Sequence, residues 1–430
     1  MAPVSPREAP PLPALDLDVV LAPFGESRGL PAVAYLSDEV FEWELRHLFE
    51  ASWTCVGRAG DIAEPGSRRA VEAGAEPVLL VRGGDGLLRA FSDVCRHRGH
   101  LLAEPGEPSS GGKAIVCPYH GWTYALDGSV LGAPSMRDVP EFDPAAHALP
   151  EVPVREWAGF AMVNVSGDGP PLADQLGSLV ETVAQWDVAG LRAGAREEYE
   201  VAANWKTISE NYHECDHCSN IHPALCRVSP PDSGANLDPD GAWVGGWMDL
   251  AEGAETMSLD GRSGGEPLPT LPGDLHRKVL YVQVAPNLLL SLHPDYVLTH
   301  RLVPLAPGRT RVECEWLFRP EILDRPGFDP AYAVEFWDRT NREDWRACES
   351  VTRGLASRTY VPGPLSSRED AVYRFLTLIA AAYGDGHFTR PRPVRAAGPV
   401  PPGSVRETDD PPPVPQRPDS PALRSVRSRR

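Results

Sequence analysis

The spacing of apolar side chains divides the chain into segments of different character. Residues 37–57 carry apolar side chains at helical spacing behind an N-cap at Ser37 or Asp38, which predicts a docking helix. From about residue 54 to 165, short apolar runs such as EPVLLVRG and GFAMVNVSG alternate with Gly, Asp and Pro. This pattern is typical of many short strands and predicts an all-β module.

The second half of the chain mixes helices and strands. A helical stretch follows Pro170, and the polar, glycine-rich residues 229–274 are expected to form long loops over a pocket. Residues 278–306 and 310–320 alternate in the way that strands do: Val312, Cys314, Trp316 and Phe318 share one face, opposite Arg311, Glu313 and Glu315. Long helices are predicted at 331–357 and 367–383.

These patterns predict an α+β chain of four parts. We expect a flexible, proline-rich segment over residues 1–36 and an all-β domain with its leading helix over 37–168. An antiparallel sheet packed against long helices is expected over 169–385. Residues 386–430 are Pro, Arg and Ser with few large apolar side chains, so we expect this tail to be disordered.

Composition and charge narrow the classes of partner. The chain is globular in composition, with 42% hydrophobic and 23% charged residues, and its net charge of -19 argues against nucleic acid or anionic lipid. No run approaches about 20 apolar residues, and the N-terminus lacks a signal-peptide pattern, so we expect a cytoplasmic protein. Eight cysteines are too few for a disulfide scaffold, and we expect thiols or metal ligands.

Two mixed pairs of cysteine and histidine lie within the β-rich part. Cys95 and His97 stand in CRHRGH, and Cys117 and His120 stand in CPYHGW. Zinc fingers more often pair Cys with Cys and His with His, because each pair comes from one knuckle or one helical turn. Mixed pairs on two loops instead favour a [2Fe-2S] cluster with two cysteines on one iron and two histidines on the other. A zinc ribbon is the alternative, and both interpretations leave His100 outside the ligand set.

The segment ENYHECDHCSNIHP, residues 210–223, gathers a second set of metal-binding side chains. Glu214 and His217 are three residues apart and share one face of a helix. His217 and His222 are five apart, or about 140° around an ideal helix, so they converge on one ion only if the helix loosens. Pro223 makes such unwinding plausible. Two histidines and a carboxylate from elsewhere would form the facial triad of a non-haem Fe(II) oxygenase.

The cysteines of this segment allow a second interpretation. Cys215 and Cys218, with His213, His222 or Cys226, would form a structural zinc site. If the iron interpretation holds, the three cysteines are instead small, buried apolar fillers, which is the usual role of a free cysteine.

Both sets of residues resemble those of Rieske non-haem iron oxygenases. CRHRGHLL and CPYHGWTYALDGSVLG are similar to the two cluster-binding loops of Rieske proteins, including Gly121 and Trp122. NWK (204–206), ENYHEC and the two histidines that follow resemble the catalytic domain of the choline, carnitine and glycine-betaine monooxygenase branch. The resemblance covers about residues 40–385. It implies a Rieske domain within 37–168 and a helix-grip catalytic domain within 169–385.

The resemblance implies a role for each matching residue. It gives the [2Fe-2S] cluster the ligands Cys95, His97, Cys117 and His120. It gives one mononuclear Fe(II) the ligands His217, His222 and Asp344, where Asp344 matches the ligand aspartate in TNREDWRACESVTRGL and Glu343 is the fallback. Glu214 matches the carboxylate that bridges the two centres.

The resemblance also implies an activity and partners. We expect an oxygenase component that uses O2 to hydroxylate or oxidatively N-demethylate a small substrate, such as a quaternary ammonium compound. The sequence shows no convincing flavin or nicotinamide segment, so a separate NAD(P)H-dependent reductase or a ferredoxin would supply electrons. Family geometry implies a head-to-tail homotrimer, in which Glu214 would link a cluster histidine of one subunit to His217 of the next.

The substrate stays open at this stage. Asp216 stands where an aromatic residue often precedes the first iron histidine, and Thr352 stands where glutamine often follows in the ligand helix. Because these departures weaken analogies of substrate, an aromatic-ring-hydroxylating dioxygenase alpha subunit is the alternative, and a zinc-stabilised binding protein a remote one. Aromatic side chains that could contact a cation are Trp243, Trp247, Tyr281, Tyr296 and Trp316, and polar candidates for the pocket are His293, Asp295 and His300, although ordinary packing is the simpler role for each.

Overall fold

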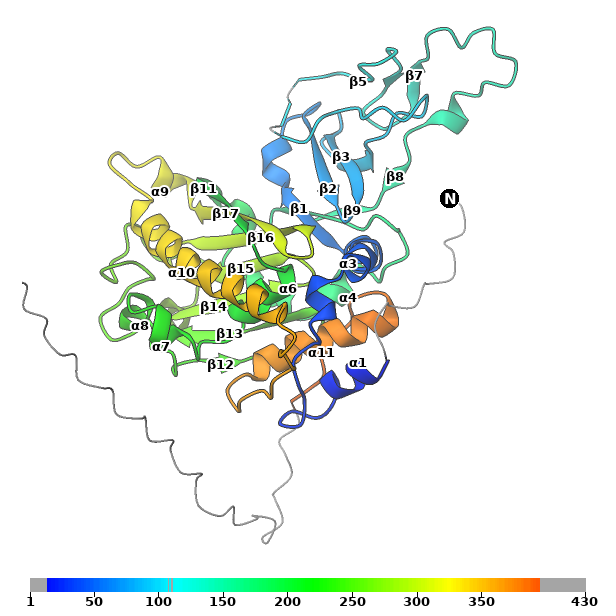
Figure 1. Ribbon diagram of the computed structural model, residues 1–430. Coiled ribbons are helices and arrows are strands. Elements are labelled where there is room, and N and C mark those ends of the chain that lie inside the picture. Colours follow the sequence, from blue (N-terminus) through cyan, green and yellow to red (C-terminus); the bar gives the residue numbers. More distant parts are fainter. Residues whose placement is uncertain (1–13, 107, 110, 395–430) are drawn as a thin grey trace, which may run out of the picture. The chain divides into compact units, whose positions relative to one another are not determined.

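A seven-stranded antiparallel sheet forms the centre of the larger domain (Figure 1). The structure, a computed structural model, describes residues 14–106, 108–109 and 111–394. The strand order is β11-β17-β16-β15-β14-β13-β12. The strands are β11 (Arg192–Val201), β12 (Ala235–Asn236), β13 (Trp243–Asp249), β14 (Lys278–Val284), β15 (Leu288–Leu292), β16 (Val297–Ala306) and β17 (Arg309–Phe318).

The alternation predicted for the last strand is confirmed. In β17, Val312, Cys314 and Trp316 are buried, whereas the side chains between them are partly exposed. A strand with one apolar face must bury that face against another layer, and helices provide this layer here.

Strand β13 corrects the expectation of long loops over residues 229–274. Its two glycines, Gly245 and Gly246, make the segment look like a loop in the sequence, but the strand needs them. A Cβ atom at Gly245 would overlap the carbonyl oxygen of Tyr281 on the neighbouring strand, and one at Gly246 would overlap Ala235. Close backbone approach is one reason for glycine inside a strand.

Helices pack against the sheet, with α10 (Ala331–Leu355) in contact with β11 and α11 (Asp370–Asp385) in contact with β13. The long helix α10 also contacts α6 (Trp205–Tyr212), and so does α11 (Figure 1). Both long helices predicted from the sequence are therefore confirmed, with α11 starting three residues later than expected. The remaining helices of this domain are short: α4 (Leu172–Leu176), α5 (Leu179–Ala184), α7 (Cys218–Ile221), α8 (Leu225–Val228) and α9 (Pro320–Leu323), with 3-10 turns at Val188–Gly190 and Gly273–Arg277.

Residues 54–163 form an all-β module, as their sequence predicts. Three small antiparallel sheets have the orders β1-β10-β9, β2-β3-β4-β8 and β5-β6-β7. The strands are β1 (Thr54–Arg58), β2 (Arg68–Ala73), β3 (Glu76–Arg82), β4 (Leu88–Ser92), β5 (Ile115–Val116), β6 (Thr123–Tyr124), β7 (Val130–Gly132), β8 (Glu151–Val152), β9 (Val154–Trp157) and β10 (Phe160–Val163), with 3-10 turns at Ala59–Ile62 and Ala145–His147.

A buried amide ties the all-β part to the large sheet. Asn287 accepts a hydrogen bond from the backbone N–H of Cys55 at 3.0 Å and donates one to the Cys55 carbonyl at 3.0 Å. Because a buried amide must find such partners, this exchange fixes the start of β1 against the turn before β15.

The leading helix is shorter than its apolar spacing suggests. Ser37 caps α3 (Asp38–Glu44) by accepting a hydrogen bond from the N–H of Val40, as predicted. A π-helical turn at Leu45–Phe49 ends the helix, and residues 50–53 lead into β1.

The expectation of flexible ends is wrong for part of each end. Residues 14–36 include α1 (Ala14–Val20) and α2 (Val33–Leu36), and Val20 and Leu30 are fully buried. Tyr373 of α11 also donates a hydrogen bond to the carbonyl of Ala22. At the other end, Phe388 is buried, so order extends past residue 385. The physical reason is the apolar surface of α11, which both segments cover. Residues 1–13 and 395–430 lie outside the described residues.

No helix within the described residues is long and apolar enough to cross a membrane.

Candidate metal sites and cavity

The NWK motif, residues 204–206, anchors the start of helix α6. The side chain of Asn204 caps the helix by accepting a hydrogen bond from the N–H of Lys206. Lys206 is 0% exposed and donates to Glu44 at 2.6 Å, while the indole N–H of Trp205 donates to the same carboxylate at 2.9 Å. Tyr383 of α11 also donates to Glu44. The motif therefore positions the helix and does not itself contact the second metal set.

The chain leaves the helix after Tyr212 and presents two histidines from a short loop. His217 is the N-cap of α7, and His222 follows its last residue. The backbone of His222 has φ -119° and ψ 61°, outside the helical region. This departure from the helix turns the second ring toward the first, and the ring centroids lie 5.2 Å apart. The loosening anticipated from Pro223 is present at His222.

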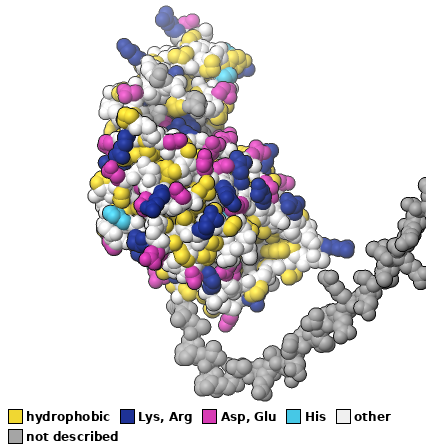
Figure 2. All heavy atoms as spheres, turned by 90° about the vertical axis from the view of Figure 1, so that its left-hand side faces the viewer, with side chains coloured by type: hydrophobic (Ala, Val, Ile, Leu, Met, Phe, Trp, Pro, Cys, Tyr) yellow, Lys and Arg dark blue, Asp and Glu magenta, His cyan; other side chains and the backbone are white. Residues whose placement is uncertain are grey.

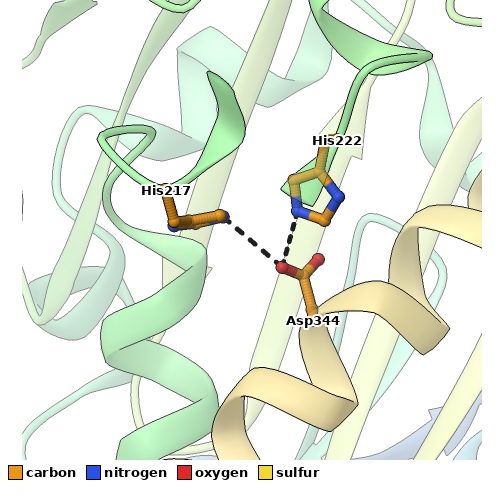
Figure 3. A group of neighbouring side chains, drawn as sticks. All are labelled: His217, His222 and Asp344. Carbon is orange, nitrogen blue, oxygen red and sulfur yellow. Dashed lines mark hydrogen bonds and ion pairs between the residues drawn. The ribbon is translucent and has the colours of Figure 1, made fainter. Parts of the chain in front are cut away.

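The two histidines meet an aspartate of α10. Nε2 of His222 lies 2.8 Å from Oδ1 of Asp344, and Nε2 of His217 lies 3.4 Å from the same oxygen (Figure 3). One ligand atom from each residue falls within 4.8 Å of the other two. Two imidazole nitrogens and one carboxylate oxygen on one side of an ion match the facial triad of a non-haem iron site.

A second carboxylate lies behind each histidine ring. Nδ1 of His217 hydrogen-bonds Glu214, and Nδ1 of His222 lies 2.9 Å from Glu343. When Nδ1–H donates to a carboxylate, Nε2 is left as the free lone pair that a metal requires. Glu343, the fallback ligand, therefore lies on the far nitrogen of His222, while its neighbour Asp344 faces the metal position.

Charge inside the triad shifts the pKa values of its members. Burial alone would lower the pKa of His217, but hydrogen bonds to Asp344 and Glu214 outweigh burial and raise it to about 9. Burial alone would raise the pKa of Asp344, but hydrogen bonds from the two histidines lower it. Because two imidazole nitrogens and one carboxylate oxygen converge within 4.8 Å of one another, the residues fit a metal ion.

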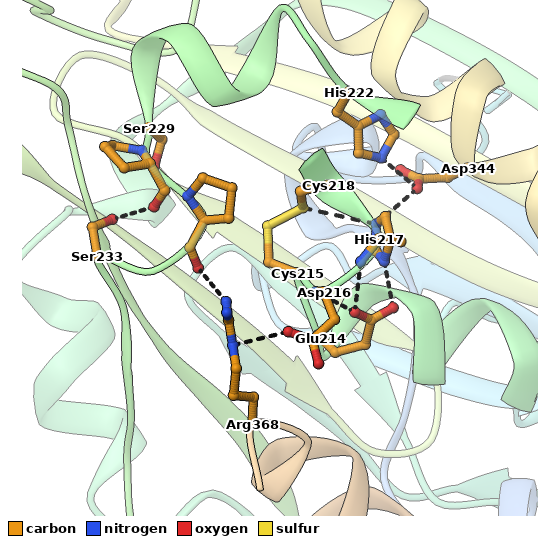
Figure 4. Close-up of a disulfide and its surroundings, with 12 residues drawn as sticks. Glu214, Cys215, Asp216, His217, Cys218, His222, Ser229, Ser233, Asp344 and Arg368 are labelled. Atoms are coloured by element: carbon orange, nitrogen blue, oxygen red, sulfur yellow. Dashed lines mark hydrogen bonds and ion pairs between the residues drawn. A yellow bond between two sulfur atoms is a disulfide. The ribbon is translucent and has the colours of Figure 1, made fainter. Parts of the chain in front are cut away.

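A disulfide flanks His217. Cys215 and Cys218 are joined, so the expectation that both are free, buried fillers is wrong (Figure 4). The C-x-x-C spacing on a tight turn brings the two sulfurs together, whereas on a continuous helix the side chains would serve as separate apolar contacts. Cys226 is free and partly exposed.

The disulfide also removes the donors of the alternative zinc site. A disulfide sulfur is not a thiolate, and thiolates are what a zinc knot requires. His213, the other candidate donor, lies with Nε2 3.0 Å from the amide oxygen of Gln283. Burial lowers its pKa to about 4, so it is a neutral core histidine.

The first metal set lies on two loops of matching geometry. Gly99 and Gly121 each stand four residues after a cysteine, and the N–H of each donates to that cysteine's carbonyl at 3.1 Å. Both glycines have positive φ, 74° and 71°, which a residue with a side chain adopts only with strain. The two loops therefore have the same turn.

The four candidate cluster ligands converge from these loops. Cys95 and Cys117 are buried, and the rings of His97 and His120 have centroids 4.6 Å apart. Nδ1 of His97 is buried without a hydrogen-bond partner in the described structure, as expected of an atom reserved for a metal. These features fit a [2Fe-2S] cluster held by two cysteines and two histidines.

Neighbouring residues support this first set. Trp122 stacks on His97 at 5.0 Å, and the hydroxyl of Tyr124 lies 3.3 Å from Sγ of Cys95. Nδ1 of His100 lies 2.6 Å from the carbonyl of Leu101, as expected for a residue outside the ligand set.

A cavity of about 500 Å³ opens beside the triad. His217, His222 and Asp344 line it, and so do Trp247 and Tyr281 among the aromatic residues expected from the sequence. The other expected aromatics, Trp243, Tyr296 and Trp316, are buried in the core. Among the polar candidates, His300 lines the cavity, whereas Asp295 is held by hydrogen bonds from Thr256, Ser263 and Tyr332, and His293 stacks on Tyr296.

Sequence reasoning missed several cavity residues. The walls include Tyr212, Trp337 and Trp345, and Arg368 and Asp370 also line the cavity. Asn341 lines the cavity as well, and a signal was available for this residue and for Trp337. Trp337 and Asn341 precede Asp344 by seven and three residues, so they share its face of α10.

Two models of known families match this chain. A Rieske [2Fe-2S] domain matches residues 52–143, and the catalytic domain of ring-hydroxylating alpha subunits matches residues 188–385. The oxygenase subunit of glycine betaine monooxygenase from Chromohalobacter salexigens is 31% identical over 368 residues, which cover 78% of this chain and 81% of that protein. The oxygenase subunit of carnitine monooxygenase from Escherichia coli K12 is 38% identical over 205 residues, 46% of this chain and 54% of that protein.

Solved structures give a consistent result. The quaternary ammonium Rieske monooxygenase CntA in complex with L-carnitine superposes with a TM-score of 0.72 at 27% identity, over 86% of this chain and 99% of that chain. A further structure of a quaternary ammonium Rieske monooxygenase, described with insights into inter-subunit electron transfer, gives a TM-score of 0.74 at 27% identity, over 87% and 100%. Naphthalene 1,2-dioxygenase from Rhodococcus, at 20% identity and a TM-score of 0.69 over 83% and 94%, shares the fold.

Proposed function

This chain belongs to the Rieske non-haem iron oxygenases, and we propose that it monooxygenates a small quaternary ammonium compound. Enzymes of this family are oxidoreductases that carry one Rieske [2Fe-2S] cluster and one mononuclear iron in the oxygenase component. We propose Cys95, His97, Cys117 and His120 as the cluster ligands and His217, His222 and Asp344 as the iron ligands.

The aromatic lining of the cavity carries the proposal. Five aromatic side chains contribute to its walls: Tyr212, Trp247, Tyr281, Trp337 and Trp345. Tyr281 lies with its ring centroid 6.0 Å from that of Tyr212 and 6.3 Å from that of Trp337, so three rings are neighbours along one wall. A quaternary ammonium group has no N–H to donate, and aromatic faces attract it through cation-π contact.

The charge of the cavity favours the same ligand. Its lining includes five carboxylates, Glu214, Asp216, Asp232, Asp344 and Asp370, and one arginine, Arg368. Arg368 is already paired with Asp216 at 2.9 Å. The two positive charges of the proposed iron would offset part of this excess, and the net negative charge that remains attracts a cation and disfavours a purely anionic substrate. A plain arene would gain the aromatic contacts but not this electrostatic term.

The protein's own groups orient the reacting centre. Glu214 and Glu343 hold the two imidazole rings from behind, and Asp344 closes the third side. When bound, the iron supplies O2 activation, and the cluster supplies single electrons. The overall reaction joins one oxygen atom to a C–H carbon and reduces the other to water, which takes two electrons and two protons. Hydroxylation beside the nitrogen would release an N-methyl group as an aldehyde.

A separate NAD(P)H-dependent reductase or a ferredoxin is the proposed electron donor. On the face in Figure 2, basic and acidic side chains are interspersed, so the net charge of -19 does not gather there as one acidic patch.

We further propose a cytoplasmic homotrimer in which Glu214 bridges to the cluster of a neighbouring subunit. The side chain of Glu214 is 17% exposed, which leaves an edge for that contact.

Single-turnover chemistry tests the proposal without the natural reductase. Chemically reduced holoenzyme is mixed with ¹⁸O2 and with glycine betaine, carnitine or choline, and the products are identified by mass spectrometry. At least one ammonium compound should acquire a single labelled oxygen or lose one methyl group as formaldehyde. The neutral carbon isostere of choline, 3,3-dimethylbutanol, should bind at least about tenfold more weakly.

Specific outcomes would contradict the proposal and favour one of the two alternatives. Equal affinity for choline and its neutral isostere, or incorporation of both oxygen atoms into an arene such as naphthalene, would favour the ring-hydroxylating dioxygenase instead. A colourless holoprotein without a visible cluster band would support a zinc-stabilised binding protein.

A further inference from the structure

The Cys215–Cys218 disulfide lies in the wall of the cavity beside the triad. Both cysteines line the cavity, and the turn between them carries His217 (Figure 4). Cys218 is 3% exposed and Cys215 is partly exposed, so a small reductant entering the cavity meets Cys215 first. Thiol–disulfide chemistry begins at an accessible sulfur.

One of the two sulfurs is within reach of the metal position. Sγ of Cys218 lies 3.9 Å from Nε2 of His217, the ring nitrogen that faces Asp344. In a tetrahedral site with a metal–sulfur bond of about 2.3 Å and a metal–nitrogen bond of about 2.0 Å, such donor atoms lie about 3.5 Å apart. As a free thiolate, Cys218 therefore needs only a small rotation to share an ion with His217.

We propose that Cys215 and Cys218 form a reversible redox site that sets the number of ligands on the metal. In the oxidised form neither sulfur is a thiolate, and the triad keeps vacant positions. In the reduced form the thiol of Cys218 releases its proton to solvent on binding the metal, and the thiolate becomes a fourth ligand and closes one of them. This inference rests on the metal site and not on the choice of substrate.

The chemical step balances with simple reagents. A dithiol reductant gives up two electrons and two protons as its own disulfide forms, the Cys215–Cys218 bond breaks, and each cysteine gains one hydrogen. Hydrogen peroxide reverses the step: its O–O bond breaks, two molecules of water form, and the disulfide closes. The open form of the site thus belongs to oxidising conditions, in which O2 is also available.

Mass spectrometry tests the redox pair itself. Full-length holoprotein is treated with diamide, whose N=N bond accepts the two electrons and two protons, then unfolded and alkylated. The peptide with residues 215 and 218 should be unlabelled and lighter by two hydrogen atoms, and prior treatment with a phosphine should allow both cysteines to be labelled. Labelling of both cysteines after diamide would overturn the proposal.

Zinc serves as a probe of the ligand set, because its X-ray absorption edge is separate from that of the cluster iron. After a chelator removes the mononuclear iron, zinc is added to one equivalent per chain. The phosphine then reduces the disulfide: it is oxidised to its oxide, with water supplying the oxygen atom and the two protons. A zinc–sulfur distance of about 2.3 Å should appear after reduction and be absent before it.

Three variants make the outcome decisive. Cys215→Ser leaves Cys218 permanently free and should show the sulfur ligand with or without the phosphine. Cys218→Ser should show it in neither state, and the matched control Cys226→Ser should behave as the parent chain does. Absence of sulfur from both the reduced parent and Cys215→Ser would show that the disulfide has no role at the metal.

Discussion

A carboxylate oxygen of Glu343 lies 2.9 Å from Nδ1 of His222. Arg339, one turn earlier on α10, lies 3.2 Å from the other oxygen of this carboxylate and holds it in place. Replacement of Glu343 by alanine should lower iron affinity by about 10- to 100-fold, because the second imidazole loses its orientation and basicity. Competition with a chelator measures the change, and the cluster spectrum should be unaffected.

Two further variants separate this effect from general damage to α10. Glu343→Gln keeps an acceptor for Nδ1–H and should retain more affinity than the alanine variant. Glu335→Gln changes an exposed carboxylate on the same helix and should bind iron normally. Equal iron affinity in Glu343→Ala and the parent chain would show that Glu343 does not support iron binding.

Loss of one proposed iron ligand should separate the two metal centres. His217→Ala should keep the visible spectrum of the cluster but abolish turnover, and the metal content should fall from about three irons per chain to two. Elemental analysis beside the optical spectrum checks this. Iron retained at three per chain would mean that His217 is not a ligand.

The bridging role proposed for Glu214 has its own kinetic signature. Glu214→Gln keeps a hydrogen-bond acceptor for His217 and should retain both metals, but it removes the charge and should slow reoxidation of the cluster. Stopped-flow absorbance of the reduced cluster after mixing with O2 and substrate reports the step. Reoxidation at the parent rate would leave Glu214 as an orienting group alone.

The buried ion pair between Lys206 of α6 and Glu44 of α3 should contribute to the stability of the fold. Lys206→Met leaves the carboxylate of Glu44 buried without its cation and should lower the free energy of unfolding by about 3–5 kcal/mol. The double variant with Glu44→Gln removes the unpaired charge and should recover part of that loss. Urea unfolding of the parent and both variants measures the effect, and a double variant less stable than Lys206→Met would contradict this account.

Glu210, a partly buried acid of α6, should make stability depend on pH. Burial raises the pKa of Glu210 to about 7, and Tyr35 donates a hydrogen bond to its carboxylate at 2.6 Å. Because the folded state binds the proton more tightly than the unfolded state does, this group contributes stability below about pH 4.5 that is lost as pH rises to about 7.

Glu210→Gln should remove that dependence while keeping an acceptor for Tyr35. The variant's stability relative to the parent should rise between about pH 4.5 and 7 by at most about 3 kcal/mol, then stay constant. Urea unfolding at several pH values provides the comparison. A difference independent of pH would mean that Glu210 does not titrate in this range.

Local patterns carried much of the prediction. The strand pattern of residues 310–318 and the helix over 331–355 follow from side-chain periodicity within each segment. The two loops with Cys95 and Cys117 are also local, because each closes on itself through a glycine four residues on. Such features need no knowledge of distant contacts.

Features that depend on contacts between distant segments could not be predicted from the sequence. The contact between Glu343 and His222 joins residues 121 positions apart, and only the docking of α10 on the loop after α6 creates it. Strand β13 depends on close approach to the backbone of Tyr281. Its glycines permit this approach, but in the sequence they are equally typical of a loop. Order in residues 14–36 follows from their contact with α11, more than 300 residues later.

Helix α10 has a consequence for changing the enzyme's selectivity. Its unbroken run from Ala331 to Leu355 fixes the direction of Asp344, so one inserted residue ahead of that position would turn the carboxylate by about 100° and destroy the triad. Pro231 and Asp232 line the same cavity but lie in a loop with no such register. Mutant libraries that aim at new substrates should therefore vary the loop in length and keep the helix at its present length.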